Sequence, residues 1–348
     1  MDETLVSPIT TSHAVDLGMP DDSLIHLGAW LRENGYRFIT VTPATHARVW
    51  ARAPAAAAAS LQDVFGWSRP FERSLLPEHA LKLLEAAGAL EQHGDLLRSR
   101  VRYSTLDDSL YVHSAYPTTQ PDAVFFGPDT YRFAALIRHT LRAQRGGAIQ
   151  SIVDIGCGSG AGGIVAAHAL RTLRPRLILT DINPAALRYA RANAALAGLS
   201  PVSFRQGDLY AVIDEPIDLI VANPPYLLDA EARAYRHGGG DLGSGLSLRI
   251  VVEGIPRLAS GGTMILYTGA PMVSGNDPFL ASVQTQLEGA DVQWEYFEMD
   301  PDVFGKELDH PAYAQVERIA AVALVIRKRA AGEAASAGSS TTPERGSP

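Results

Sequence analysis

Apolar residues recur at helical spacing in the first third of the chain and then at alternating positions. The stretches 23–36 (SLIHLGAWLRENGY) and 77–90 (PEHALKLLEAAGAL) each place apolar residues on one helical face and reach a glycine near their ends. Residues 96–114 (LLRSRVRYSTLDDSLYVHS) alternate and turn at LDDS, as a β-hairpin does. Helices followed by a small hairpin are typical of a winged-helix-like module, so we expect an α+β accessory domain over residues 21–120.

From about residue 121 the pattern changes to apolar strands that alternate with helices. We expect strands in SIVDIG, RLILTDI, VSFRQGDLY and IDLIVANPPY, with helices in AGGIVAAHALRTL and NPAALRYARANAALAGL between them. Three later apolar runs, GGTMILYTG, VQWEYFEMD and RIAAVALVIRK, complete a sheet. Repeated strand–helix units predict a doubly wound, Rossmann-like α/β domain over residues 121–330, whose ligand site lies at the carboxyl ends of the strands.

Charge and composition narrow the classes of partner. The chain of 348 residues carries a formal net charge of −8 and neither half is basic, which disfavours a non-specific grip on nucleic acid. Its single cysteine, Cys157, excludes an internal disulfide framework and a multi-cysteine metal site. No apolar run approaches the roughly 18 residues of a membrane span, and the N-terminus lacks a signal-peptide layout. We expect a cytoplasmic protein that uses neither membrane nor metal, with unstructured ends at residues 1–20 and 331–348.

The loop after the first strand of the α/β domain contains two overlapping glycine patterns. Gly156, Gly158 and Gly160 form G-x-G-x-G, whereas Gly158, Gly160 and Gly163 form the dinucleotide pattern G-x-G-x-x-G. Either pattern allows close backbone approach to a ligand at the N-terminus of a helix. Asp181 closes the next strand, where a ribose-binding carboxylate belongs in both interpretations. The loop and Asp181 therefore leave the identity of the cofactor open.

A motif at the end of the fourth strand decides between the two interpretations. The strand DLIVA runs into Asn223-Pro224-Pro225-Tyr226. With VDIGCGSG, TDINPAALRYARANA and QGDLY in order before it, the chain resembles the class I S-adenosylmethionine-dependent methyltransferases that carry an N-P-P-Y motif, over about residues 120–330. Dehydrogenases have no use for this motif at that strand end. The resemblance thus implies S-adenosylmethionine as the cofactor in place of NAD.

The resemblance also implies a role for each residue of the cofactor site. The members of the family hold the cofactor with residues at the strand ends. Here these are Gly156, Gly158 and Gly160 beside the methionine portion, Asp154 at its amino group, Asp181 at both ribose hydroxyls, Asp208 at the adenine amino group, and Ile182 and Leu209 against the adenine ring. Asn223, at the end of the fourth strand, is also expected to contact the cofactor.

Residues 126–130 (FGPDT) open an expected helix over residues 123–141, where Asp129 or Thr130 can cap free amides. The segment resembles the part that covers the cofactor in related enzymes, which implies contacts from Phe126 and Thr130. It departs from the Arg-Pro-Glu-Thr form common among members that methylate protein glutamine, and this departure counts against a glutamine acceptor.

The N-P-P-Y motif implies a planar nitrogen as the methyl acceptor, either an amide or an exocyclic amine. Asn223 accepts one N–H through its side-chain carbonyl, and the backbone carbonyl of Pro224 accepts the other. Pro224 and Pro225 stiffen the turn, and Tyr226 stacks on the planar group. Holding the acceptor in line with the methyl group is the main catalytic task, so no metal is required.

The methyl acceptor itself stays open at the level of the sequence. The architecture is similar to that of release-factor glutamine methyltransferases and of ribosomal RNA guanine-N2 methyltransferases, so a protein or an RNA is favoured. The chain has only three lysines to hold phosphates, which weakens the RNA interpretation. A small metabolite is a further acceptor, and a non-catalytic S-adenosylmethionine-binding module is the alternative outside enzymes. Residues 236–248 are a flexible connection or a substrate lid, and residues 299–313 are a further candidate border of the pocket.

Overall fold

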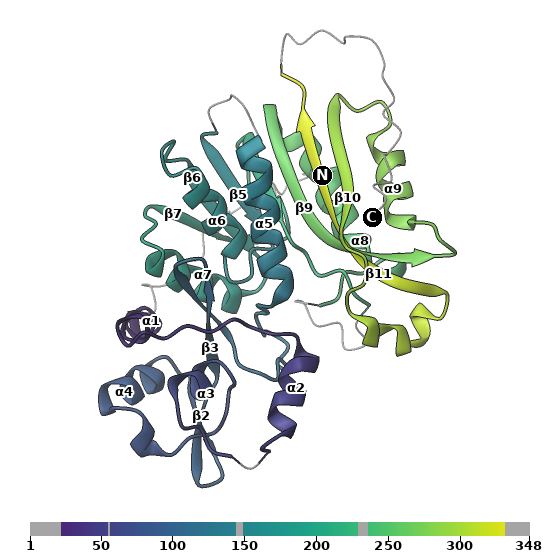
Figure 1. The fold of residues 1–348 in the computed structure, drawn as a ribbon. Coiled ribbons are helices and arrows are strands. Elements are labelled where there is room, and N and C mark those ends of the chain that lie inside the picture. Colours follow the sequence, from purple (N-terminus) through teal and green to yellow (C-terminus); the bar gives the residue numbers. More distant parts are fainter. Residues whose placement is uncertain (1–21, 55, 144–148, 229–235, 331–348) are drawn as a thin grey trace, which may run out of the picture.

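The computed structural model describes residues 22–54, 56–143, 149–228 and 236–330 (Figure 1). The unstructured ends expected at residues 1–20 and 331–348 lie outside the described residues. The α-helices are α1 (Asp22–Glu33), α2 (Pro43–Ala51), α3 (Leu61–Phe65), α4 (Glu78–Ala86), α5 (Pro128–Ala143), α6 (Ala161–Ala169), α7 (Pro184–Leu196), α8 (Gly245–Gly254) and α9 (Pro278–Leu287). None of these helices is long and apolar enough to span a membrane.

The strands fall into one large sheet and two hairpins. They are β1 (Leu90–His93), β2 (Leu96–Ser99), β3 (Val101–Leu106), β4 (Ser109–Ser114), β5 (Ser151–Ile155), β6 (Arg176–Asp181), β7 (Val202–Gln206), β8 (Ile217–Ala222), β9 (Leu258–Val273), β10 (Val292–Asp300) and β11 (Val316–Lys328). The sheet has seven strands in the order β10-β11-β9-β8-β5-β6-β7. Strands β9, β8, β5, β6 and β7 are parallel, and β10 and β11 are antiparallel. The expected mostly parallel α/β sheet is therefore confirmed.

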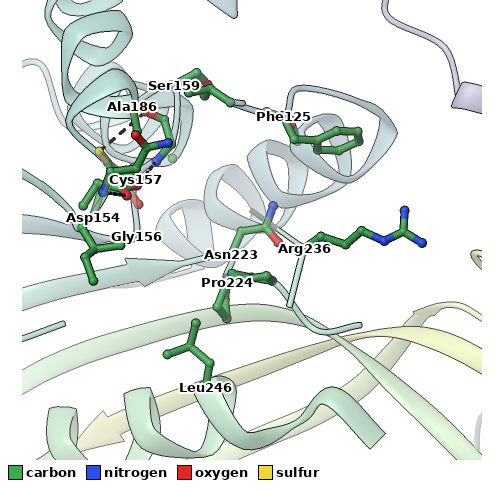
Figure 2. A pocket seen from close by; sticks show the side chains of 18 of the residues that line it. Phe125, Asp154, Gly156, Cys157, Ser159, Ala186, Asn223, Pro224, Arg236 and Leu246 are labelled. Carbon is green, nitrogen blue, oxygen red and sulfur yellow. Dashed lines mark hydrogen bonds between the residues drawn. The ribbon is translucent and has the colours of Figure 1, made fainter. Parts of the chain in front are cut away.

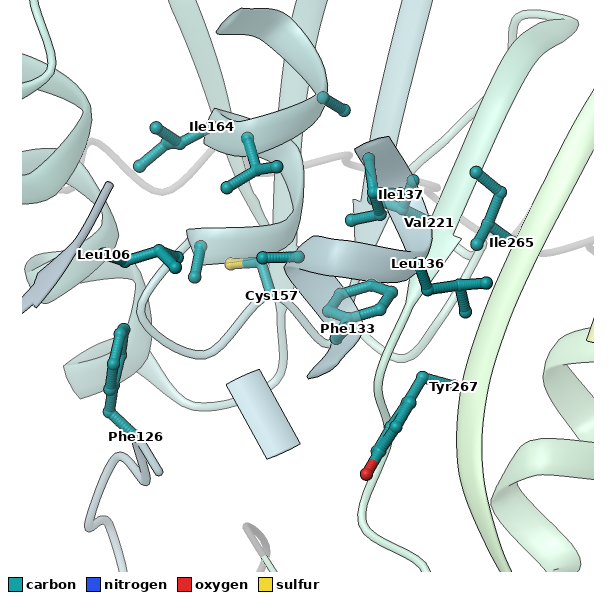
Figure 3. Close-up of a cluster of buried hydrophobic side chains, with 14 of the residues drawn as sticks. Leu106, Phe126, Phe133, Leu136, Ile137, Cys157, Ile164, Val221, Ile265 and Tyr267 are labelled. Carbon is teal, nitrogen blue, oxygen red and sulfur yellow. The ribbon is translucent and has the colours of Figure 1, made fainter. Parts of the chain in front are cut away.

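Helices cover both faces of this sheet, because successive residues of its strands point in opposite directions (Figure 1). Leu219 and Val221 of β8 pack with side chains of α5, α6 and α7. Ile220 and Ala222 of the same strand pack with side chains of α8 and α9. Figure 3 shows the first of these layers, in which α5 lays Phe133 against the strands. Burial on both faces explains why the central strands are nearly continuous apolar runs.

The N-terminal elements form a separate apolar cluster built from α1, α3, α4 and the two hairpins. Both helices expected here are present, and the β3–β4 hairpin turns between Leu106 and Ser109, where LDDS predicted it. The β1–β2 hairpin was missed, because residues 96–114 read as one alternating stretch. Its strands pair Leu90 with Ser99, so the chain reverses once more before β3 begins.

Candidate active site

A cavity of about 350 Å³ lies at the carboxyl ends of the parallel strands. The loops that follow β5, β6, β7 and β8 line it, together with the segment that leads into α5. Figure 2 shows its two ends: Gly156 and Asp154 lie on one side, Phe125 and Arg236 lie on the other, and Asn223 lies between them. This is where a doubly wound sheet is expected to bind its ligand.

Two of the three glycines assigned to the cofactor line the cavity, and the third does not. Gly156 has φ +64° and no atom within 4 Å of the point where a Cβ would stand, so its backbone faces open space. Gly158, at φ +52°, also lines the cavity. Gly160 is turned inward: a Cβ there would lie 3.1 Å from Leu179 and 3.2 Å from Ala190. Its φ of +77° makes it the cap of α6, so its role is to start the helix.

Asp154, the fourth residue of β5, presents a buried carboxylate to the glycine-loop end of the cavity. Its Oδ2 accepts a hydrogen bond of 2.7 Å from the backbone N–H of Gly163. Burial raises the pKa of Asp154 to about 7, and the nearby Asp181 adds to the rise. A cationic amino group beside this carboxylate would favour its ionised form. The position suits the expected contact with the amino group of the cofactor.

Asp181, the last residue of β6, ties the glycine loop to the start of α7. Its Oδ2 accepts from the N–H of Gly158 at 2.8 Å, and its Oδ1 accepts from the N–H of Asn183 at 2.9 Å. A carboxylate offers about four acceptor sites, so both oxygens can take further donors from the cavity. Ile182 lies beside it with 61% of its surface exposed, in the cavity wall. A carboxylate next to an exposed apolar side chain suits a ribose joined to a flat base.

Asp208 lines the cavity, but its carboxylate already has a partner that the sequence did not reveal. Nη2 of Arg249, on α8, lies 3.0 Å from its Oδ2, and Arg249 also pairs with Glu253. The hydrogen bond to Asp208 and that to Glu253 raise the pKa of the guanidinium. The adenine amino group assigned to Asp208 would therefore share this carboxylate with Arg249. Leu209, buried at φ +46°, contributes an apolar wall to the cavity.

Phe126, which the resemblance assigns to the cofactor, lies in the core and away from the cavity. Phe126 is fully buried, stacks on His113 and contacts Tyr111, and it does not line the cavity. Its neighbour Phe125 lines the cavity instead, because successive side chains of an extended segment point in opposite directions (Figure 2). Thr130 lines the cavity as expected.

At the start of α5, Thr130 is the cap among the two candidates that the sequence offered. Thr130 Oγ1 accepts from the N–H of Gly127 at 3.3 Å, and so satisfies one amide at the helix start. Asp129 does not cap. Its carboxylate accepts from the Tyr267 hydroxyl at 2.7 Å and pairs with Arg132 at 3.3 Å. Burial raises the pKa of Asp129, and these two partners lower it in part.

The four residues of the N-P-P-Y motif all line the cavity, directly after β8. Asn223 and Pro225 are half-buried, whereas Pro224 and Tyr226 are buried. The ring of Tyr226 meets Phe304 edge to face, with centroids 5.7 Å apart. Burial and the nearby Asp129 raise the pKa of its hydroxyl, so Tyr226 stays neutral. The motif thus offers neutral hydrogen-bond acceptors and an aromatic wall.

The rim beyond Asn223 is formed by residues that the motifs did not single out: Phe125, Arg236, Leu246 and Phe304. Phe304, in the candidate border segment 299–313, has φ +57°, in the left-handed region. Nη2 of Arg236 lies 2.5 Å from Oε2 of Glu307, which comes from the same segment. This end of the cavity is therefore aromatic and carries an ion pair.

Charge is distributed unevenly along the cavity. Among the residues that the structure describes, four acidic side chains line it, Asp129, Asp154, Asp181 and Asp208, against one base, Arg236, at the rim. A cofactor with a sulfonium and an ammonium group is cationic, and carboxylates stabilise nearby positive charge. Cys157 also lines the cavity, and burial together with Asp181 raises the pKa of its thiol, which keeps it protonated and unreactive. The residues present therefore fit S-adenosylmethionine.

Comparison with known proteins agrees with this geometry. A family model described as the methyltransferase small domain matches residues 125–268. A release factor glutamine methyltransferase of Deinococcus radiodurans is 34% identical over 168 residues, which cover 45% of this chain and 55% of that protein. One of Xylella fastidiosa is 35% identical over 148 residues, covering 38% and 52%. The chain thus matches about half the length of these relatives.

Among solved structures, a tRNA m1G37 methyltransferase of Methanocaldococcus jannaschii superposes with a TM-score of 0.44 at 14% identity, covering 67% of this chain and 58% of that one.

Proposed function

We propose that this protein is an S-adenosylmethionine-dependent methyltransferase that methylates a side-chain amide nitrogen of a protein, because residues 125–268 match the model of the methyltransferase small domain and the glutamine methyltransferases are similar over this region. The observation that carries the proposal is the position of Asn223-Pro224-Pro225-Tyr226 in the cavity wall, between the acidic end and the aromatic rim. The relatives named as release factor glutamine methyltransferases support glutamine as the acceptor residue.

The acidic end of the cavity binds and orients the cofactor in this proposal. Asp154 holds its amino group, Asp181 its ribose, and Ile182 with Leu209 its base. When bound, S-adenosylmethionine supplies an electrophilic methyl group on a sulfonium.

The N-P-P-Y residues act on the nitrogen that receives this methyl group. Asn223 Oδ1 and the Pro224 carbonyl accept its two N–H groups, which fixes the direction of its lone pair. The nitrogen would gain the methyl group as the bond from that methyl carbon to sulfur breaks, with the electron pair left on the now neutral sulfur, and the nitrogen would release one proton to solvent. Alignment supplies most of the rate, because a well-oriented pair of reactants can gain roughly 7–11 kcal/mol over free encounter.

A labelling experiment with defined acceptors tests the proposal. The protein is incubated with methyl-tritiated S-adenosylmethionine and a purified bacterial peptide chain release factor, and in parallel with total cell extract. We expect label that protease removes and nuclease leaves, and none on a release factor whose acceptor glutamine is replaced by asparagine. Label that nuclease removes would assign the acceptor to RNA and overturn the protein assignment. Label only in the small-molecule fraction would make the protein a metabolite methyltransferase.

A further inference from the structure

Residues 236–245, which we call the glycine clamp, fold back onto the N-P-P-Y segment. The N–H of Leu227 donates to the carbonyl of Arg236 at 3.2 Å, and the N–H of Gly238 donates to the carbonyl of Leu227 at 2.8 Å. Leu227 and His237 form a parallel bridge. The clamp therefore pairs with the chain directly after Tyr226.

Two glycines make this contact possible, because backbone here packs directly on backbone. A Cβ on Gly238 would lie 2.7 Å from the carbonyl oxygen of Pro225 and 2.8 Å from the Cα of Tyr226. A Cβ on Gly243, which has φ +88°, would lie 2.4 Å from the carbonyl oxygen of Tyr226. Real Cβ atoms essentially never approach other atoms this closely. A side chain at Gly243 would therefore push against Tyr226, and one at Gly238 would push against both the motif and the carbonyl oxygen of Gly243, so the clamp and the motif could not keep this contact.

Tyr226 is confined from its other sides as well. A Cβ on Gly269 of β9 would lie 2.2 Å from the ring of Tyr226, so the ring rests directly on the strand. The clamp is itself anchored: the N–H of Leu246 donates to the carbonyl of Gly238 at 2.8 Å, and Arg236 pairs with Glu307. The motif thus has backbone on one side, a strand on another and Phe304 on a third.

We propose that the glycine clamp positions the methyl acceptor. This inference rests on the proposed function, in which the Pro224 carbonyl and the Tyr226 ring hold the acceptor nitrogen. By fixing the backbone of Pro225, Tyr226 and Leu227, the clamp sets the directions of that carbonyl and that ring. A displacement of about 1 Å at a reacting centre can lower the rate about 100-fold, so this confinement has catalytic consequences. Gly238 and Gly243 are positioning residues, since they act through the motif and not on the substrate.

The chain offers a matched pair of variants for the test. Gly239 and Gly243 both lie in the clamp with positive φ, but Gly239 has nothing within 4 Å of its Cβ point. Asparagine tolerates positive φ better than most residues, so G239N controls for an asparagine at positive φ in the clamp, and G243N adds the clash with Tyr226. We expect G243N to lower kcat about 100-fold with an unchanged Kd for S-adenosylmethionine, and G239N to resemble the wild type. Equal kcat values for all three proteins would overturn the proposal.

Hydrogen exchange gives a readout that needs no acceptor. The amides of Leu227 and Gly238 are bonded across the contact, so we expect them to exchange slowly in the wild type and in G239N and faster in G243N. The amide of Gly163, bonded to Asp154, should exchange alike in all three proteins. If the wild-type enzyme transfers no methyl label to protein, the proposed function is overturned. The exchange difference between G243N and G239N would still show whether the clamp holds the motif. Identical exchange at Leu227 in all three proteins would overturn the clamp while leaving the function intact.

Discussion

Asn223 stands half-buried at the end of β8, between the acidic end of the cavity and its rim (Figure 2). Its amide oxygen is the neutral acceptor that the proposed transfer requires, whereas the carboxylates assigned to the cofactor come from other strand ends. We therefore expect N223A to lower kcat at least about 100-fold, as loss of one oriented polar group does in other active sites. The Kd for S-adenosylmethionine, measured by calorimetry, should stay close to that of the wild type. N34A, at the exposed end of α1, is the control, and full activity in N223A would remove the central role given to this residue.

The buried carboxyl of Asp154 makes cofactor binding depend on pH. Its pKa of about 7 means that near neutral pH the empty site holds the acid partly protonated. A cationic amino group binds the ionised form, so affinity should fall as the pH drops below 7, by up to about tenfold per pH unit. Calorimetric titrations between about pH 5.5 and 8.5 measure this slope, and D154N should bind more weakly with a flat profile. A wild-type profile as flat as that of D154N would contradict the assignment.

The same carboxyl links pH to the stability of the empty protein. An unfolded aspartate titrates near about 3.9, so between about pH 4 and 7 the folded state binds more protons at Asp154 than the unfolded state. The contribution of Asp154 to the free energy of unfolding is therefore present at low pH and lost as the pH rises through 7.

Phe125 and Phe126 give adjacent substitutions with opposite consequences. Phe126 is fully buried among aromatic rings, so F126A should lower the free energy of unfolding by about 3–5 kcal/mol. Phe125 lines the cavity and is half-buried, so F125A should change stability little and raise the KM for the acceptor or the cofactor. Urea denaturation and steady-state kinetics on both variants measure the contrast. A stability loss of equal size in both would place Phe125 in the core as well.

At the scale of elements, the sequence predicted most of the sheet, because a strand buried on two faces leaves a long apolar run. The seven segments expected as strands all occur as strands, in one sheet. The loop that follows β8 escaped prediction for the opposite reason. The clamp glycines carry no periodic apolar pattern, and their positions depend on contacts with Pro225 and Tyr226 that the sequence does not express. A glycine-rich sequence indicates a turn or a close backbone contact, but it does not identify the residues on the other side of that contact.

The residues of the site also divide into those that the sequence predicted and those that it did not. Positions inside a strand-end motif were predictable, since the apolar pattern located the strands: Asp154 is the last residue but one of β5, Asp181 is the last of β6, and Asn223 directly follows β8. Arg249 and Arg236 were not, because they meet Asp208 and Glu307 across 41 and 71 residues of chain. Phe125 and Phe126 show a finer limit: the correct segment was found, but not the side chain that faces the cavity. Tertiary packing decides which of two adjacent side chains faces the cavity. When both residues are phenylalanine, the sequence does not distinguish them.

At the scale of the molecule, α7 joins the N-terminal elements to the sheet. One side of this helix packs with the sheet, and Ala192 packs in the N-terminal cluster. A Cβ on Gly28 of α1 would lie 2.7 Å from Leu196 of α7, so the two helices are in direct contact. Asn193 is fully buried at this junction. Its amide accepts from the N–H of Val112 at 2.7 Å and donates to the carbonyls of Val112 and Ser159 at 3.0 and 2.9 Å.

One buried side chain therefore connects the β3–β4 hairpin to the glycine loop. N193A would leave three buried backbone groups without this partner, so we expect the free energy of unfolding to fall by about 3 kcal/mol or more. Since Ser159 belongs to the loop that lines the cavity, the Kd for S-adenosylmethionine should rise as well. Urea unfolding followed by tryptophan fluorescence reports mainly the N-terminal elements, which hold Trp30, Trp50 and Trp67, whereas circular dichroism reports the whole chain. Coincident transitions in the wild type that separate in N193A would show that this contact couples the two parts, and unchanged midpoints in both signals would contradict it.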